Sequence, residues 1–136
     1  MAIIEGGRVV RTIKQSNSKL SANWVTALAV QEGLLFIGTY GGGIDLLLPN
    51  GEIKSLSSEI GKFEVNLNAI LVDGRFVYVG TLDVGLWVFD SKQNKWKNFR
   101  SGLPSQNIMS IARSGKHLFL ATESGVARLE VKRFEN

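Results

Sequence analysis

One pattern of residues occurs three times along the chain. The pair Gly38-Thr39 returns as Gly80-Thr81 and again as Ala121-Thr122. The residues around these pairs keep the same order of apolar, turn and polar positions. The interval is about 42 residues, which is the length of one four-stranded β-propeller blade. Such a chain is expected to fold as a stack of similar units that contact only their neighbours.

Each copy of the pattern contains four short apolar runs separated by turns. In the first copy these runs lie at 25–30, 34–39, 44–48 and 52–56. Glycines and the Asn50-Gly51 pair separate them, and these residues favour tight turns because they tolerate positive φ. The 15 glycines and 2 prolines of the chain also suit an all-β protein. We predict β-propeller blades of four antiparallel strands and no helix.

The copies predict a single domain over 1–136 with about three blades. The predicted blades span 23–57, 65–99 and 106–134, and the third lacks its outer strand because too few residues follow it. Blades in a propeller surround a central channel.

The N-terminal residues predict the outer strand of a further blade. Val10 and Ile13 occupy the same repeat positions as Ile53 and Leu56, about 43 residues later. We interpret 8–13 as an orphan outer strand, preceded by Ile3-Ile4 as a remnant of another strand.

These incomplete ends predict assembly. A propeller ring has about four to eight blades, so three blades cannot close one. We predict a homodimer that forms a six-bladed ring by exchanging outer strands, because two-fold assemblies are the commonest oligomers. Its predicted interface residues are Val10, Ile13, Val126 and Leu129. The alternative is that the chain forms part of a larger propeller.

Three segments resemble a known repeat. They are Gly102-Leu103-Pro104-Ser105-Gln106-Asn107-Ile108, then Leu34-Leu35-Phe36-Ile37-Gly38-Thr39-Tyr40-Gly41-Gly42-Gly43, and Gly85-Leu86-Trp87-Val88-Phe89-Asp90. Together they resemble the two-component regulator propeller repeat. In that family, many-bladed repeats form periplasmic ligand-sensing regions of hybrid sensor kinases. The resemblance implies propeller blades. We expect a cytoplasmic location for the chain as it stands, and a periplasmic one if it belongs to a sensor.

Composition excludes several classes of site. The chain has no cysteine, which excludes disulfides and thiolate-bound metals. No apolar run reaches the roughly 20 residues of a membrane helix. The net charge of +4 makes an anion or nucleic-acid binder a third hypothesis. The basic residues are scattered and do not alternate with aromatic ones, so a solvated β surface is favoured over a nucleic-acid interface. We predict no metal and no cofactor.

Candidate binding residues lie in loops expected on one face of the ring. Function usually resides on such loops. Trp24 precedes an inner strand and aligns with Asn66 and Asn107. The complete set of candidates is Trp24, Tyr40, Asp83, Asn66, Asn107 and Glu123. They predict a non-enzymatic binding and assembly module that recognises a small molecule, glycan or protein partner.

An enzymatic alternative rests on two carboxylates. Asp83 and Glu123 fall in equivalent turns, and carboxylates from several blades can hold a cation in a propeller channel. This arrangement would suit a metal-assisted hydrolase or lyase. His117 is the only histidine and is expected on the surface, and no residue is assigned a catalytic role.

Overall fold

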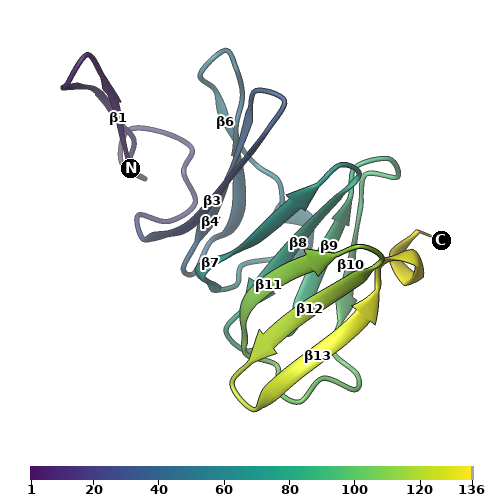
Figure 1. Ribbon diagram of the computed structural model, residues 1–136. Coiled ribbons are helices and arrows are strands. Elements are labelled where there is room, and N and C mark those ends of the chain that lie inside the picture. The colour runs from purple at the N-terminus through teal and green to yellow at the C-terminus, as the bar shows by residue number, and fades with distance from the viewer. Residues whose placement is uncertain (136) are drawn as a thin grey trace.

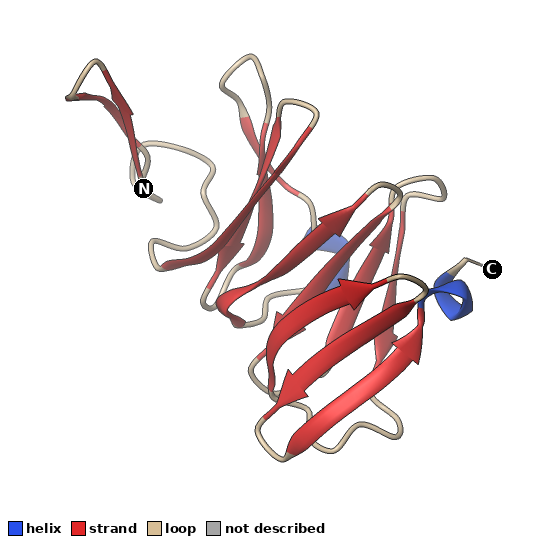
Figure 2. Cartoon of the chain, viewed as in Figure 1, coloured by secondary structure: helices blue, strands red, loops and turns tan. Residues whose placement is uncertain are grey.

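The protein, described for residues 1–135 by a computed structural model, is built of antiparallel strands joined by turns and loops (Figure 1). Its helical segments in this range are two single turns, η1 (Ser58–Ile60) and η2 (Val131–Phe134) (Figure 2). The prediction of an all-β fold is confirmed, although the two turns were not anticipated. Within the described range, no helix is long and apolar enough to cross a membrane. Asn136, the end of the predicted domain, lies outside the described residues.

Two of the sheets are complete four-stranded blades. The first blade contains β3 (Val25–Gln31), β4 (Leu34–Thr39), β5 (Gly43–Leu47) and β6 (Ile53–Ser55). The middle blade contains β7 (Val65–Asp73), β8 (Phe76–Thr81), β9 (Leu86–Asp90) and β10 (Lys95–Phe99). In both blades each strand pairs with the next one along the chain. This is the meander of a β-propeller blade.

The other two sheets are incomplete. The last blade contains β11 (Ile108–Ser114), β12 (His117–Thr122) and β13 (Gly125–Glu130). The N-terminal hairpin pairs β1 (Ala2–Glu5) with β2 (Arg8–Thr12). Figure 1 shows the hairpin and the last blade at opposite ends of the stack, with β7 of the middle blade between β3 and β11.

The blades stack because successive side chains of a strand point to opposite faces. In β4, Phe36 faces the middle blade and packs in one apolar cluster with Val77 and Val79 of β8. Its neighbour Ile37 faces the other way and packs with Ile13, next to the N-terminal hairpin. Each complete blade is therefore apolar on both faces.

The junction between the middle and last blades repeats this arrangement. Tyr78 and Leu86 of the middle blade share an apolar cluster with Leu118 and Leu120 of the last blade, and all four are fully buried. Burying one leucine side chain stabilises a fold by roughly 1.5–3 kcal/mol. The junctions thus supply much of the stability of the stack.

The repeated glycine lets adjacent blades approach closely. A Cβ atom on Gly38 would lie 2.8 Å from Val65 Cγ1, and one on Gly80 would lie 2.8 Å from Ile108 O. Both contacts are too short, so the next blade leaves no room for a side chain there. The corresponding residue of the last blade is Ala121, which is exposed.

The threonine after each of these positions closes a turn. The Oγ1 atoms of Thr39, Thr81 and Thr122 donate to the carbonyl oxygens of Gly43, Gly85 and Gly125 at 2.9, 2.7 and 2.7 Å. Each hydroxyl thus joins the second strand of its blade to the start of the third.

The N-terminal hairpin packs as half of a further blade. Ile13, just after β2, is fully buried in a cluster with Leu20, Ile37 and Ile53. The N-terminal amine of Met1 donates to Ile13 O at 3.1 Å. The segment predicted as an orphan strand is therefore not unpaired, because β1 is its partner.

Candidate functional site

The inner strands of the three blades begin around one hollow. Its volume is about 310 Å³, within the range of about 300–1,000 Å³ that is usual for small-molecule sites. It lies where β3, β7 and β11 start, beside the turn that follows β4. The residues that line it are Trp24, Thr26, Tyr40, Asn66, Leu67, Asn107 and Met109.

Two aromatic rings form one wall of the hollow. Trp24 precedes β3 and Tyr40 follows β4, and Tyr40 N donates to Trp24 O at 2.8 Å. Their ring centroids lie 4.5 Å apart at an angle of 41°. Trp24 is nevertheless 60% exposed. An exposed ring with its orientation fixed by a neighbour offers a flat apolar surface on which a ligand can stack.

Asn66 ties the middle blade to the last one at the base of the hollow. Its Nδ2 donates to Ile108 O at 2.7 Å, to Asn107 Oδ1 at 2.8 Å and to Thr81 O at 3.0 Å. These contacts fix the side-chain amide. Among residues 1–135, none donates to its Oδ1 atom, so this acceptor remains available at the hollow.

Thr26 and Asn107 are held by similar contacts. Thr26 Oγ1 donates to Val65 O at 2.6 Å and links the first blade to the middle one. Asn107 Oδ1 accepts from Asn66 Nδ2 of the middle blade, and Asn107 Nδ2 lies 3.5 Å from Glu123 Oε2 within its own blade. The polar groups of the hollow are thus positioned by bonds between blades, which lowers the entropy cost of ordering them around a ligand.

The hollow carries no formal charge. All seven lining residues have uncharged side chains at neutral pH. This arrangement suits a neutral ligand, whose binding would depend little on ionic strength.

The structure brings four of the six predicted binding residues together. Trp24, Tyr40, Asn66 and Asn107 all line the hollow. Asp83 lies exposed in the turn after β8, and Glu123 reaches the site only through Asn107. Neither carboxylate belongs to the lining, and the role of all six in binding stays a prediction.

Three lining residues escaped the sequence analysis because each lies at a register shift of an inner strand, and the shift is widest in β7. Between its paired residues Val65 and Ile70 the register shifts, whereas β3 shifts between Val25 and Ala27. Asn68 has φ of 58° within this bulge. Thr26 and Met109 lie within the shorter shifts of β3 and β11, and Leu67 lies within the wider shift of β7. A regular strand alternation does not represent these shifts, so it did not identify the three residues as members of the site.

The bulge also corrects one alignment. In the first blade, Trp24 O accepts a hydrogen bond from Tyr40 N. In the middle blade, Glu64 O accepts the equivalent hydrogen bond from Leu82 N. The counterpart of Trp24 in the middle blade is therefore Glu64, and the prediction that it is Asn66 is wrong. Asn66 reaches the hollow from two positions further along, through the bulged backbone.

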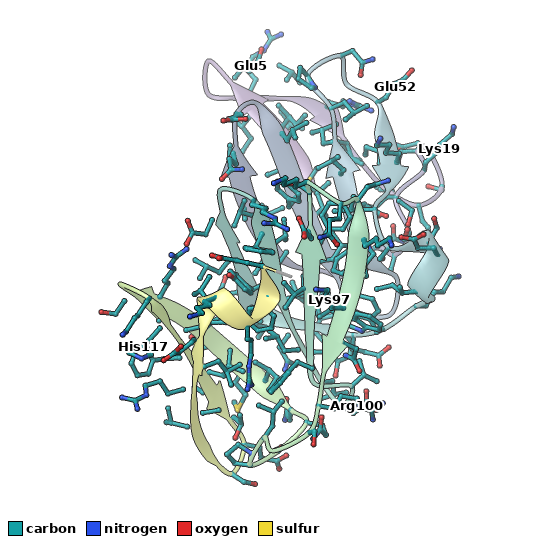
Figure 3. The ribbon with its side chains drawn as sticks, turned by 90° about the vertical axis from the view of Figure 1, so that its right-hand side faces the viewer. Glu5, Lys19, Glu52, Lys97, Arg100 and His117 are labelled. Carbon is teal, nitrogen blue, oxygen red and sulfur yellow. The ribbon has the colours of Figure 1, made fainter. Side chains whose placement is uncertain are left out.

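Side chains that might bind a metal do not gather. Within residues 1–135, no three histidine, cysteine, aspartate or glutamate side chains form a group able to hold a metal ion. The labelled His117 lies at the periphery of the molecule (Figure 3), with its ring centroid 6.3 Å from that of Phe119. No specific observation favours the hydrolase alternative.

The predicted interface residues fall into two groups. Val10 and Val126 are 48% and 70% exposed, whereas Ile13 and Leu129 are buried within the chain itself. In a single copy, only the two valines present their side chains to solvent.

The ionisable groups with shifted pKa values lie away from the hollow lining. Burial raises the pKa of Asp45, whose carboxylate accepts from the amide and the hydroxyl of Ser21 at 2.7 and 2.6 Å. Burial also raises the pKa of Tyr78 to about 12. Both groups serve packing: Asp45 fixes the segment that leads into β3, and Tyr78 fills a blade junction.

Neither a family model nor a curated protein matches this sequence. Solved structures do. The computationally designed Ika4 protein has a TM-score of 0.69 and 17% identity, and the match covers 92% of this chain and 74% of Ika4. The computationally designed Ika8 protein has a TM-score of 0.66 and 16% identity, with 92% of this chain and 37% of Ika8 covered.

A natural protein is also similar. The extracellular domain of BT3049 from B. thetaiotaomicron, assigned as a hybrid two-component system, has a TM-score of 0.73 and 24% identity. The match covers 92% of this chain and 18% of that domain, so the chain spans a small part of it. At these identities the likeness shows the fold, which is that of β-propeller blades.

Proposed function

We propose that this chain is a non-enzymatic β-propeller binding module that holds a small neutral ligand in the hollow at the start of the inner strands. One observation carries the proposal: Trp24, Asn66 and Asn107, from three different blades, converge on this hollow. A site built at the junction of several rigid elements keeps its geometry without a ligand.

The chemistry of the lining favours a neutral sugar or a similar ring. The C–H face of a pyranose is apolar and stacks on exposed aromatic rings, here those of Trp24 and Tyr40. Its hydroxyl groups would donate to Asn66 Oδ1. Leu67 and Met109, which are 65% and 53% exposed, would cover the remaining apolar edge.

We also propose that the blades belong to the two-component regulator propeller repeat. The fold-level likeness to the extracellular domain of a two-component system supports this assignment. It would make ligand recognition by this chain similar in kind to that of a sensor region.

Titration with a panel of neutral mono- and disaccharides tests the binding proposal. Binding would be followed by calorimetry and by tryptophan fluorescence. We expect at least one sugar to bind and Trp24→Ala to weaken it about tenfold or more, because exposed aromatic anchors dominate such sites. Leu28→Ala is the matched control, since Leu28 is also exposed on β3 but lies outside the lining.

Two results would contradict this proposal. One is a panel in which no neutral sugar binds. The other is a sugar whose affinity is equal for Trp24→Ala and Leu28→Ala. Affinity that falls steeply with added salt would point to a charged ligand and a different site.

A further inference from the structure

The last blade ends in a free strand edge beside a groove. Among residues 1–135, β13 pairs only with β12, whereas its counterparts β5 and β9 also pair with an outer strand. The groove has a volume of about 510 Å³. Its lining includes Phe99, Leu103, Pro104, Leu129 and Arg133. Unpaired backbone groups on such an edge are a template for another strand.

The C-terminal turn partly fills this place. Phe134 of η2 is 4% exposed, and its ring centroid lies 5.8 Å from that of Tyr78. In the complete blades the equivalent place belongs to the outer strand. Trp96 of β10 packs there against Phe89, at 5.1 Å, and Ile53 of β6 is likewise buried. Phe134 therefore substitutes for a residue of the missing strand.

A strand of the required type lies at the other end of the chain. Val10 of β2 has the same repeat position as Ile53 and Trp96. It is 48% exposed, because no other element within residues 1–135 covers it. The edge of β2 that a third strand would use is occupied by β1 in the same copy.

We propose that a second copy of this chain supplies β2 to the free edge of β13, so that two copies exchange outer strands. The register between β9 and β10 pairs Phe89 with Trp96 and Leu86 with Phe99. If β13 of one copy and β2 of the other pair in this same register, Val10 lies opposite Leu129. This register likewise places Ile13 opposite Val126, whose exposed side chain gains a partner.

In a single copy, segments of the chain itself occupy both places that the second copy would fill. β1 covers the edge of β2 that β13 would take, and η2 fills the place of the incoming Val10. Exchange must displace both, so its net free energy is the difference between similar contacts. The dimer is therefore reversible and depends on concentration. This inference is independent of ligand binding at the hollow.

One pair in this register opposes the exchange. The pairing of Val88 with Lys97 places Arg11 of one copy opposite Arg128 of the other. Both arginines are exposed. Like charges directly opposite in antiparallel strands are destabilising, and opposite charges are stabilising. The pair occurs twice in each dimer, which doubles its effect.

Light scattering on the full chain across a concentration series tests the proposal. The wild-type mass should rise from one chain of 14.9 kDa towards two. Arg128→Glu and Arg11→Glu should each shift the midpoint to about tenfold lower concentration, because each creates opposite charges. The double variant restores like charges and should return towards the wild type. If the midpoint of the double variant is instead shifted by the sum of the two single shifts, the proposed register is wrong.

A second pair of variants tests the apolar contact. Val10→Asp should prevent the rise in mass, because it places a carboxylate against Leu129. Val9→Asp is the matched control, since Val9 is 59% exposed and its repeat counterpart Lys95 is also exposed. Equal masses for both variants, or one-chain mass at every concentration for the wild type and the arginine variants, would overturn the proposal. None of these substitutions lies in the hollow. Sugar binding, tested with Trp24→Ala, is therefore measured independently of strand exchange.

Discussion

The middle and last blades are copies of one repeat that differ in what covers them. Tyr78 of the middle blade is fully buried, whereas Phe119 at the same position of the last blade is half-buried. Leu86 is 0% exposed and its counterpart Val126 is 70% exposed. Burial is therefore a property of the stack rather than of the single blade.

The outer face of the last blade is more polar than the equivalent face of the middle blade. His117 occupies the position of Phe76, and Arg128 occupies that of Val88. Within residues 1–135 no neighbouring blade covers this face, and polar side chains suit a face that contacts water. A second copy that meets this face would form a more polar and weaker contact than the junctions within the chain.

The largest expected effect separates the two faces of β12. Leu120 is fully buried in the junction, so Leu120→Ala should cost about 2–5 kcal/mol of unfolding free energy. Phe119 points to the outer face, and Phe119→Ala should cost less than half as much. Urea denaturation measures both values. Equal losses would mean that the outer face is covered, and the contrast between the blades would fail.

A smaller effect concerns acid stability. Hydrogen bonds from Arg75 lower the pKa of Asp90 in the middle blade to about 2. Its folded pKa lies below the ordinary value of 3.8, so its contribution is present above about pH 4 and is lost as pH falls towards 2. Melting temperatures between pH 2 and 6 should fall less steeply for Asp90→Asn. Glu130→Gln, the equivalent change in the last blade, is the matched control.

Much of the fold could be predicted from local patterns. The Gly38-Thr39 and Gly80-Thr81 pairs mark a close approach and a closed turn, which are required in every blade that has a following neighbour. The residues that meet these requirements recur about every 42 residues, so they can be recognised in a single sequence. The strand exchange was also predicted from the repeat, but whether it occurs depends on free energies that a repeat pattern does not contain.

The candidate site was predicted in part. Trp24 and Tyr40 stand out as aromatic residues in expected loops. Leu67 and Met109 do not, because only the bulged backbone brings them to the hollow. Phe134 was not foreseen as a substitute for the outer strand, since its role depends on contacts with Phe76 and Phe99 that lie far away in the sequence.

Amide hydrogen exchange of the wild type at concentrations where it is a single chain tests the contrast between the blades most directly. We expect strong protection along β9, which has strands on both sides. The β13 amides that face the missing strand should exchange on the order of a hundredfold faster. Equal protection of β9 and β13 in the single chain would contradict this expectation.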